Sequence, residues 1–321
     1  MAFQDIVFIE EYKHYIDVAF RKSNKQAAKI RGSKIRGTRL DKSWRIELSR
    51  IEAIKASLEG SLMKILRTFP TIDDLPEFYK ELLKLHIEIK QIKKSLGAIN
   101  WAINKINDFQ GIYSSKVKTC KQLAKINQYR REYSGRINSV LRQVRKDLII
   151  LQDVRKLLIN FPVIKEKYDK VAICGFPNVG KTTLLSKLSK SKPEINEYAF
   201  TTKKVNVGYF EGKVKGKDVK VQLLDTPGTL NRYEKMNYIE KQAHLAIKYC
   251  ADVLVYVFDL TEPYSLKKQI KLYKELKRNR IPMVVYLSKT DILDKAKIDE
   301  FVAEHKFKVY DFDELKKELL K

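Results

Sequence analysis

The sequence predicts two domains of different fold class, an all-α antiparallel helical bundle over residues 1–165 and an α/β domain over residues 166–321. Through most of the first range the apolar residues recur every three to five positions, the period of helices that bury one face. Beyond Pro162 short apolar runs alternate with helical patterns, which is typical of a mostly parallel sheet with helices on both faces. With 321 residues, 44% of them hydrophobic, the chain is long enough to build both cores.

Four helices are expected in the first domain: residues 3–20, 40–69, 73–103 and 116–159. Pro70 ends the second of them, and Pro76 suits the first turn of the third because that turn needs no backbone donor. The fourth is expected to break near Ser134 and Gly135. Helices of this length with short connections favour an antiparallel bundle.

Six strands and five helices are expected in the second domain. The strands are residues 170–174, 205–211, 218–224, 252–258, 282–287 and 306–309, and the helices are residues 181–190, 235–249, 264–279, 294–304 and 312–320. Only Glu211–Lys217 separates the second and third strands, which allows a hairpin but not a helical crossover. We therefore expect one antiparallel pair within the parallel sheet.

A short glycine-containing loop, Gly175–Thr182, lies between the first expected strand and a helical pattern. Glycines at its first and sixth positions let the backbone curl until successive N–H groups point at phosphate oxygens. Lys181 is expected to place its charge at the β- and γ-phosphates, and the Thr182 hydroxyl to ligate Mg²⁺. The predicted nucleotide-binding residues of this segment are Asn178, Val179, Gly180, Lys181, Thr182 and Thr183.

Two further segments are expected to complete the Mg²⁺ and γ-phosphate end of this site. An apolar strand leads to Asp225, which would hold Mg²⁺ through water, and to Gly228, whose N–H would sense the γ-phosphate. Between the loop and Asp225, position favours Thr202 as the residue that closes over the metal, with Thr201 second. The predicted metal ligands are Thr182, Thr202 and Asp225, and the predicted catalytic residues are Lys181, Thr202 and Gly228.

The segment Ser288–Asp291 follows the strand 282–287 and is predicted to select the base. An aspartate here accepts two hydrogen bonds from guanine, each worth roughly 1.5–3 kcal/mol, that adenine cannot offer. Asp291 takes this role, and Ser288, Lys289 and Asp291 complete the predicted GTP- or GDP-binding set. Ser288 is shorter than the asparagine usual at its position, so we expect GTP over ATP with looser binding. These motifs together predict an α/β P-loop GTPase domain behind the bundle.

The motifs around this site resemble those of the Nog family, nucleolar G proteins and archaeal relatives among the Obg-related GTPases. The resemblance lies in Lys192–Lys203, the phosphate loop, Asp225–Arg232 and Ile239–Ala243, and the layout of the bundle agrees with it. It implies a GTP-dependent factor in assembly of the large ribosomal subunit, with the helical domain contacting ribosomal RNA or proteins. The chain departs from the pattern in having Ala199 for Pro and Ser288 for Asn, and no Ser-Ala loop near Val309–Asp311.

Hydrolysis is expected to be slow because Thr229 follows Gly228, where faster GTPases place a water-orienting Gln. Unassisted turnover should be on the order of 10⁻⁴–10⁻² s⁻¹. Asn178 leaves two interpretations open. It resembles an asparagine that helps hold K⁺ against the phosphates in similar GTPases, and it also suits a tight turn.

The formal net charge is +26, and residues 21–50 carry eleven Lys or Arg against only Asp41 and Glu47. Three interpretations are open for this segment: a solvated helix face, contact with nucleic-acid phosphates and, less favoured, a membrane surface. The second agrees with ribosomal RNA and large-subunit precursor particles as partners of residues 1–165.

No apolar run reaches the roughly 20 residues of a membrane-spanning helix, and the N-terminus lacks a secretion pattern. Three scattered cysteines, Cys120, Cys174 and Cys250, suit packing in a reducing compartment. We therefore expect a cytoplasmic monomer without a membrane role. Core packing is expected for Trp44 and Trp101. An RNA-binding scaffold with an essentially non-hydrolysing nucleotide site is the rival function, and an ATPase or nucleotide kinase is disfavoured by Asp291.

Overall fold

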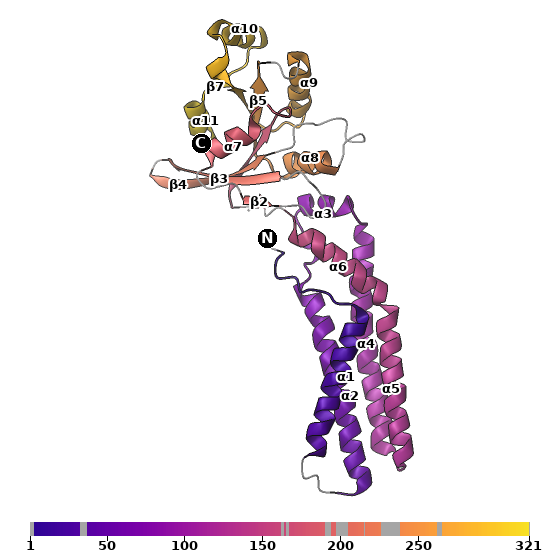
Figure 1. Ribbon diagram of the computed structural model, residues 1–321. Coiled ribbons are helices and arrows are strands. Elements are labelled where there is room, and N and C mark those ends of the chain that lie inside the picture. Colours follow the sequence, from indigo (N-terminus) through magenta and orange to yellow (C-terminus); the bar gives the residue numbers. More distant parts are fainter. Residues whose placement is uncertain are drawn as a thin grey trace. The chain divides into compact units, whose positions relative to one another are not determined.

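The computed structural model divides into two compact units, Ala2–Leu75 with His86–Ile159, and Pro76–Leu85 with Asn160–Lys321 (Figure 1). The structure describes residues 3–32, 37–161, 164, 167–189, 194–196, 205–214, 216–225, 238–261 and 265–320. The first unit is all-helical and the second is α/β, which confirms the predicted fold classes.

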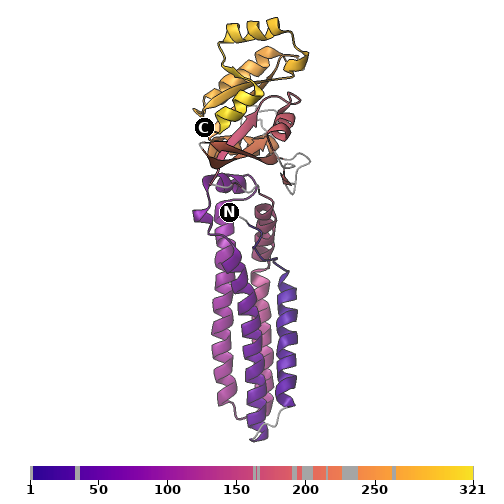
Figure 2. The same ribbon diagram turned by 90° about the vertical axis from the view of Figure 1, so that its left-hand side faces the viewer.

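The helical unit consists of α1 (Tyr12–Arg31), α2 (Arg39–Thr68), the short η1 (Ile72–Asp74), α4 (Ile89–Thr119), α5 (Leu123–Gln143) and α6 (Arg145–Ile159). The four longest helices run side by side, each reversing the direction of the one before (Figures 1 and 2). Their apolar stripes meet inside the bundle, where Leu62, Ile106 and Ile137 are fully buried. Burial of such stripes is the main stabilising contribution to helices of this kind.

Several helix limits differ from the sequence-based expectation. Phe3, Ile6 and Ile9 are buried at a helical spacing, yet they precede α1, which starts only at Tyr12. This segment is held by the bundle instead, since Arg155 donates to the Ile6 carbonyl at 2.8 Å and the Gln152 side chain accepts from the Ile9 N–H at 2.9 Å. The periodicity was therefore real, but it reflects docking onto α6 and not a helix.

The other differences concern breaks. The predicted helix 73–103 is interrupted between α3 (Glu77–Lys84) and α4, which begins at Ile89. The gap expected between residues 103 and 116 is helical, because α4 continues to Thr119 and α5 begins only at Leu123. The break expected at Ser134 and Gly135 is absent, and the chain instead changes helix at Val144, between α5 and α6. A single glycine costs about 1 kcal/mol in a helix, and the buried residues on either side of Gly135 outweigh that cost.

One carboxylate is buried inside the bundle. Glu47 on α2 is 4% exposed and lies 3.3 Å from guanidinium nitrogens of both Arg50 and Arg130, the latter on α5. The two arginines compensate for the removal of the carboxylate from water.

The α/β unit contains a seven-stranded sheet in the order β2-β3-β4-β1-β5-β6-β7. The strands are β1 (Asp169–Cys174), β2 (Glu194–Asn196), β3 (Val205–Val214), β4 (Lys217–Asp225), β5 (Val253–Asp259), β6 (Met283–Ser288) and β7 (Val309–Tyr310). β3 and β4 pair antiparallel, as the short connection predicted, and β4, β1, β5, β6 and β7 are parallel. Only β2 was not anticipated, because three residues show no periodicity.

Helices cover both faces of this sheet, as α7 (Lys181–Leu188), α8 (Tyr238–Cys250), α9 (Leu266–Lys277), α10 (Lys295–His305) and α11 (Phe312–Leu319). Side chains alternate between the faces along each strand. Val255 and Val257 belong to a core with residues of α7 and α11. Tyr256 and Phe258 face the other way, into an aromatic cluster with Tyr273 of α9.

Helix α3 belongs to the α/β unit, although its residues lie within the range 1–165. It packs against α8, and its Tyr79 ring stacks on Phe161 with ring centroids 6.2 Å apart. The Tyr79 hydroxyl accepts a hydrogen bond from the Ile164 N–H at 3.0 Å. Helix α3, from the N-terminal half of the sequence, thus contacts the residues that lead into β1.

Candidate nucleotide site

The phosphate loop follows β1, which is the point where the order of the parallel strands reverses, with β4 on one side and β5 on the other. Ligands of open α/β sheets bind at such points. The two loop glycines are both required by geometry. Gly175 has φ 148° and a Cβ there would lie 2.7 Å from the Val257 carbonyl oxygen, while Gly180 has φ 89° and closely approaches Ser288.

Lys181 begins α7 and is 7% exposed. Its ammonium donates to the Phe176 carbonyl oxygen at 2.5 Å, so the side chain folds back over the loop. Burial lowers the pKa of Lys181, and the nearby carboxylate of Asp225 partly opposes this effect. The electrostatic attraction between a phosphate and a buried ammonium is stronger than that between a phosphate and an exposed one, because less water screens the buried charge.

Thr182 and Asp225 lie in contact, with the Thr182 hydroxyl donating to the Asp225 carboxylate at 2.8 Å. Asp225 is the last residue of β4 and is 7% exposed. Both side chains offer hard oxygen atoms. In the part of the chain that the structure describes, three or more His, Cys, Asp or Glu side chains nowhere gather as for a metal ion. The hydroxyl of Thr182 and the carboxylate of Asp225 fit Mg²⁺ because this ion binds through one or two protein oxygens together with phosphates and water.

The predicted base-selecting residues follow β6 at the same edge of the sheet. Ser288 is 6% exposed and its hydroxyl donates to the Phe258 carbonyl oxygen at 3.1 Å. Asp291 lies in the one-turn η3 (Thr290–Ile292) and is exposed. Ser288 thus faces the phosphate loop on one side and β5 on the other, and Asp291 is accessible to a base.

Asp259, which the sequence reasoning missed, anchors this end of the site. It ends β5, is fully buried, and its carboxylate lies 2.6 Å from the Lys289 ammonium. Thr261 donates to the same carboxylate from its N–H at 2.9 Å and from its hydroxyl at 2.6 Å. Burial alone would raise the pKa of Asp259, but the hydrogen bonds from Lys289 and Thr261 outweigh it and the pKa is lowered.

Helix α9 holds the backbone of Asp259 through one side chain. The Gln269 amide is fully buried, accepts from the Asp259 N–H at 3.0 Å and donates to the Asp259 carbonyl oxygen at 2.8 Å. Tyr256 donates to the Gln269 carbonyl oxygen at 2.7 Å. An aspartate at the end of an apolar strand, with a threonine two residues on, was a signal for this turn.

The remaining predicted residues fall into three groups. Val179 is fully buried within the loop, whereas Asn178 and Thr183 are exposed. Asn178 has φ 62°, so the tight-turn interpretation accounts for its presence. Thr201, Thr202 and Gly228 lie outside the described residues, as does Thr229.

Expectations about single residues met different outcomes. All three cysteines are free and buried, as predicted. Trp44 is partly buried and its indole N–H donates to the Cys120 carbonyl oxygen at 2.9 Å. The prediction of core packing was wrong for Trp101, which is 38% exposed on α4.

Asp311 caps α11 by accepting from the Asp313 and Glu314 N–H groups. None of the described helices is both long and apolar enough to span a membrane.

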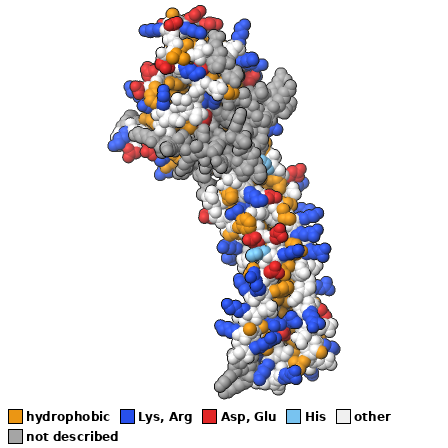
Figure 3. Space-filling view, in the orientation of Figure 1, with side chains coloured by type: hydrophobic (Ala, Val, Ile, Leu, Met, Phe, Trp, Pro, Cys, Tyr) orange, Lys and Arg blue, Asp and Glu red, His pale blue; other side chains and the backbone are white. Residues whose placement is uncertain are grey.

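A second feature lies on the helical unit, where Lys and Arg side chains spread along the face that Figure 3 shows. A groove of about 810 Å³ runs between α1 and α2. Lys22, Lys25 and Lys29 line one side, and none of the three pairs with a carboxylate among the described residues. Ala53 and Ala56 are among the small residues opposite. We call this the α1/α2 groove.

Comparison with known proteins identifies the families whose domains this chain resembles. The model of the NOG1 N-terminal helical domain matches residues 3–165, and the model described as a 50S ribosome-binding GTPase matches residues 170–289. Of the solved structures, the G domain of the T. maritima FeoB iron transporter covers 47% of this chain and 96% of its own, with 25% identity and a TM-score of 0.39.

Several relatives are similar over most of the chain. An uncharacterised protein of Methanocaldococcus jannaschii is 34% identical over 285 residues, 87% of this chain and 78% of that protein. Nucleolar GTP-binding protein 1 of Saccharomyces cerevisiae is 34% identical over 268 residues, 81% of this chain and 41% of that protein. The chain spans less than half the length of the nucleolar relatives it matches. It belongs to the NOG1 family, with the family's helical domain ahead of a P-loop GTPase domain.

Proposed function

We propose that the chain is a Mg²⁺-dependent GTP-binding protein with slow GTPase activity, acting as a switch in assembly of the large ribosomal subunit. The contact of Thr182 with Asp225 beside the buried Lys181 carries the nucleotide part of this proposal. The names of the nucleolar relatives and of the GTPase family model support the ribosomal part.

In this proposal Thr182 and Asp225 hold Mg²⁺, and Thr202 joins them when GTP is bound. The metal would neutralise charge on the β- and γ-phosphate oxygens. Lys181 turns from the Phe176 carbonyl to the phosphates, Gly228 contacts the γ-phosphate, and Asp291 accepts hydrogen bonds from guanine. Thr229 is too short to orient water as Gln does, so turnover without a partner is slow.

Base preference is the first test of the nucleotide part. A fluorescent guanine nucleotide is titrated into the chain, and ATP and GTP are compared as competitors. GTP should compete at a concentration at least about 10-fold lower, because Asp291 contributes at least one charge-assisted hydrogen bond of roughly 1.5–3 kcal/mol. Competition by ATP at parity with GTP would overturn guanine selection.

Nucleotide-dependent docking separates the switch from a scaffold. A switch binds large-subunit precursor particles with different affinities in the GTP and GDP states, and single-turnover hydrolysis is measurable. A scaffold gives one affinity and no turnover. Equal affinities in both states would therefore remove the switch.

RNA contact is proposed for the α1/α2 groove, since unpaired lysines on an exposed helix face suit phosphates. If 6–10 phosphate contacts form, RNA affinity should fall roughly 10³–10⁵-fold between 50 and 200 mM salt. A flat salt profile would indicate a protein partner in place of RNA.

A potassium ion beside Asn178 is part of the proposal with its own test. The Asn178 side chain is exposed at the phosphate loop and is accessible to a cation that supports the phosphates. Faster hydrolysis in K⁺ than in Na⁺ buffer, with and without ribosomal particles, would support it. Equal rates in both buffers would leave Asn178 only its role in the turn.

A further inference from the structure

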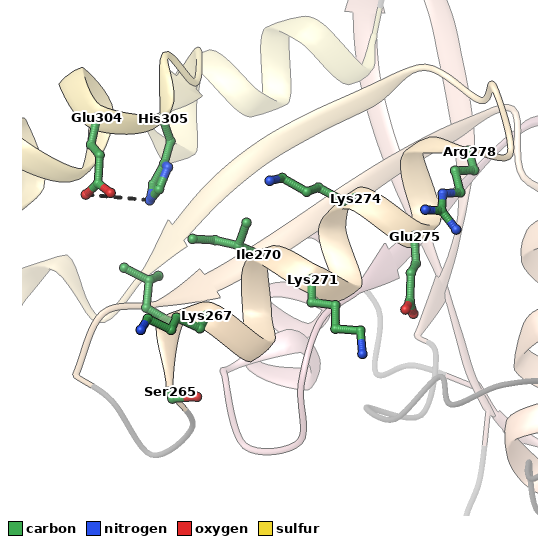
Figure 4. A pocket seen from close by; sticks show the side chains of 10 residues that line it. Ser265, Lys267, Ile270, Lys271, Lys274, Glu275, Arg278, Glu304 and His305 are labelled. Atoms are coloured by element: carbon green, nitrogen blue, oxygen red, sulfur yellow. Dashed lines mark ion pairs between the residues drawn. The ribbon is translucent and has the colours of Figure 1, made fainter.

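A second row of unpaired cations lies on the GTPase domain, along the exposed face of α9. Lys267, Lys271, Lys274 and Arg278 follow one another at four-, three- and four-residue steps, a spacing that places them on one side of the helix. Figure 4 shows these side chains along α9. From the first to the last the helix rises about 16 Å. The row is therefore long enough to meet several successive phosphates of one strand.

These four side chains have no anionic partner in the described structure. None of them lies within ion-pair distance of a carboxylate among the described residues. Glu304, which faces the row from α10, lies 3.8 Å from the His305 imidazole, and both are drawn in Figure 4. The only acidic residue of α9 that lines the same space is Glu275. Four neighbouring cations therefore repel one another until a polyanion neutralises them.

The charge of the GTPase domain is concentrated at this helix. Residues 265–280 hold seven Lys or Arg and one Glu, a net charge of +6, whereas residues 171–321 hold 29 Lys or Arg and 20 Asp or Glu, a net charge of +9. Two thirds of the excess thus lies in sixteen residues. A solvated face in a Lys-rich protein would spread the excess evenly.

The row lines a groove of about 760 Å³, which we call the α9 groove. Its wall includes Leu266 and Ile270 from α9 and Glu304 and His305 from the end of α10. The α1/α2 groove is similar in that lysines follow one another along one helix, and its other lining residues are mostly small, with one carboxylate, Glu52. Long cationic side chains on a helix suit phosphates, which are recognised by charge without sequence readout.

We propose that the α9 groove binds the phosphate backbone of an RNA strand, so that the GTPase domain is a second RNA-contacting part of the chain. This rests on the proposed function, which already assigns RNA contact to the bundle. An acidic protein segment is the alternative occupant, and the test below separates the two.

The experiment uses the full chain and single-stranded poly(U), with fluorescence anisotropy over a range of KCl concentrations. The test variant is Lys267→Gln, Lys271→Gln, Lys274→Gln, and the matched control is Lys213→Gln, Lys306→Gln, Lys317→Gln, which removes the same charge from other exposed sites of the GTPase domain. Lys22→Gln, Lys25→Gln, Lys29→Gln is made alone, as the α1/α2 variant, and is also combined with each of the other two. All test positions are exposed, and thermal unfolding checks that each variant is folded.

The test variant should bind poly(U) about 10- to 100-fold more weakly at low salt, with a salt slope smaller by about 2, since each phosphate contact on a single strand contributes about 0.7. The control should change affinity less than about 2-fold. Equal losses in test and control would overturn the proposal, as would no loss in the test variant, the result expected for an acidic protein partner.

The failure of this inference is distinguishable from failure of the proposed function. If the α1/α2 variant loses RNA binding and the α9 variant does not, only the α9 groove is refuted. If neither variant loses binding, RNA contact fails for both grooves.

Discussion

The helical bundle and the GTPase domain differ in how many charged side chains they bury and in where these lie. Among the described residues the bundle buries one acidic or basic side chain, Glu47, whereas the GTPase domain buries Lys181, Asp225 and Asp259. These three lie in or beside the loops that follow parallel strands, so they gather at one edge of the sheet. Elsewhere both domains leave their cations exposed, in the α1/α2 groove and the α9 groove. A small charged ligand is held by few desolvated groups in fixed positions, whereas a polymer is held by many exposed ones.

The largest effect is expected from Lys181→Ala, which tests whether a buried charge dominates the nucleotide site. Losing a desolvated charge partner of the phosphates should cost about 2–5 kcal/mol, or roughly 30-fold to several thousand-fold in GTP affinity. Titration with fluorescent GTP and GDP measures it, and single-turnover hydrolysis should disappear. Lys187→Ala, at an exposed position of the same helix, is the matched control. A loss below about 3-fold would show that the loop backbone alone binds the phosphates.

Glu47→Gln tests the buried charge of the bundle. Removing one partner of a buried pair costs about 3–5 kcal/mol, but Arg130 is 31% exposed and water relieves part of this, so about 1–3 kcal/mol is expected. Urea unfolding of the full chain measures the loss in the bundle transition. Glu59→Gln removes a carboxylate that is more exposed and should cost less than about 1 kcal/mol. Equal costs would mean that the burial of Glu47 is energetically irrelevant.

Asp259→Asn tests whether the base end depends on a buried anchor. Releasing Lys289 should weaken GTP and GDP binding about 10-fold, or about 1.4 kcal/mol, and reduce the preference over ATP. Asp252→Asn breaks the more exposed pair with Lys170, at the opposite end of β1 and β5, and is the control. If the GTP to ATP ratio is unchanged while stability falls, Asp259 only supports the fold.

The lowered pKa of the Asp259 carboxyl group predicts that the stability of the fold depends on pH. The pKa of Asp259 is lower in the folded chain than the roughly 3.9 of an unfolded aspartate. Its contribution is therefore complete above about pH 4 and lost as the pH falls through the folded value. Urea unfolding from pH 6 to pH 3 should show the wild type approaching Asp259→Asn below pH 4. A constant difference between them over this range would contradict the assignment.

The smallest effect concerns the cysteines. Burial raises the pKa of the Cys250 thiol to about 12, so almost no thiolate exists at pH 8. Cys120 and Cys174 are buried as well. Ellman's reagent should react with all three only after unfolding, and a rapid reaction of one thiol in the folded chain would contradict the packing.

The sequence predicted the GTPase domain better than the bundle, for physical reasons. Strands and helices there are short and differ in period, and Lys181, Thr182, Asp225 and Asp291 occupy positions that short motifs define. In the bundle a helical spacing was present at Phe3, Ile6 and Ile9 without a helix, because apolar spacing reports contact with a core and not the backbone conformation. The break at Val144 carries neither Gly nor Pro, so no helix-breaking residue marks it in the sequence.

Asp259 shows what short motifs omit. It contributes through Lys289 and Thr261, which lie on both sides of it in space but 30 and two residues away in sequence. The contact between Asp259 and Lys289 becomes visible only when β5 and β6 are paired, because that pairing places Asp259 beside Ser288, the residue before Lys289. Support of a binding residue by a neighbouring strand depends on register, which one sequence does not display.

Helix α9 has one further consequence, because its two faces meet different partners. On the buried face, Gln269 makes hydrogen bonds to the backbone of Asp259. On the outer face, Lys271 and Lys274 line the α9 groove, and the three residues lie within six positions of one helix. An anion bound in the α9 groove would therefore share one helix with the side chain that holds Asp259. Coupling between two binding sites is reciprocal. If RNA bound at α9 changes the affinity for nucleotide by some factor, nucleotide changes the affinity for RNA by the same factor.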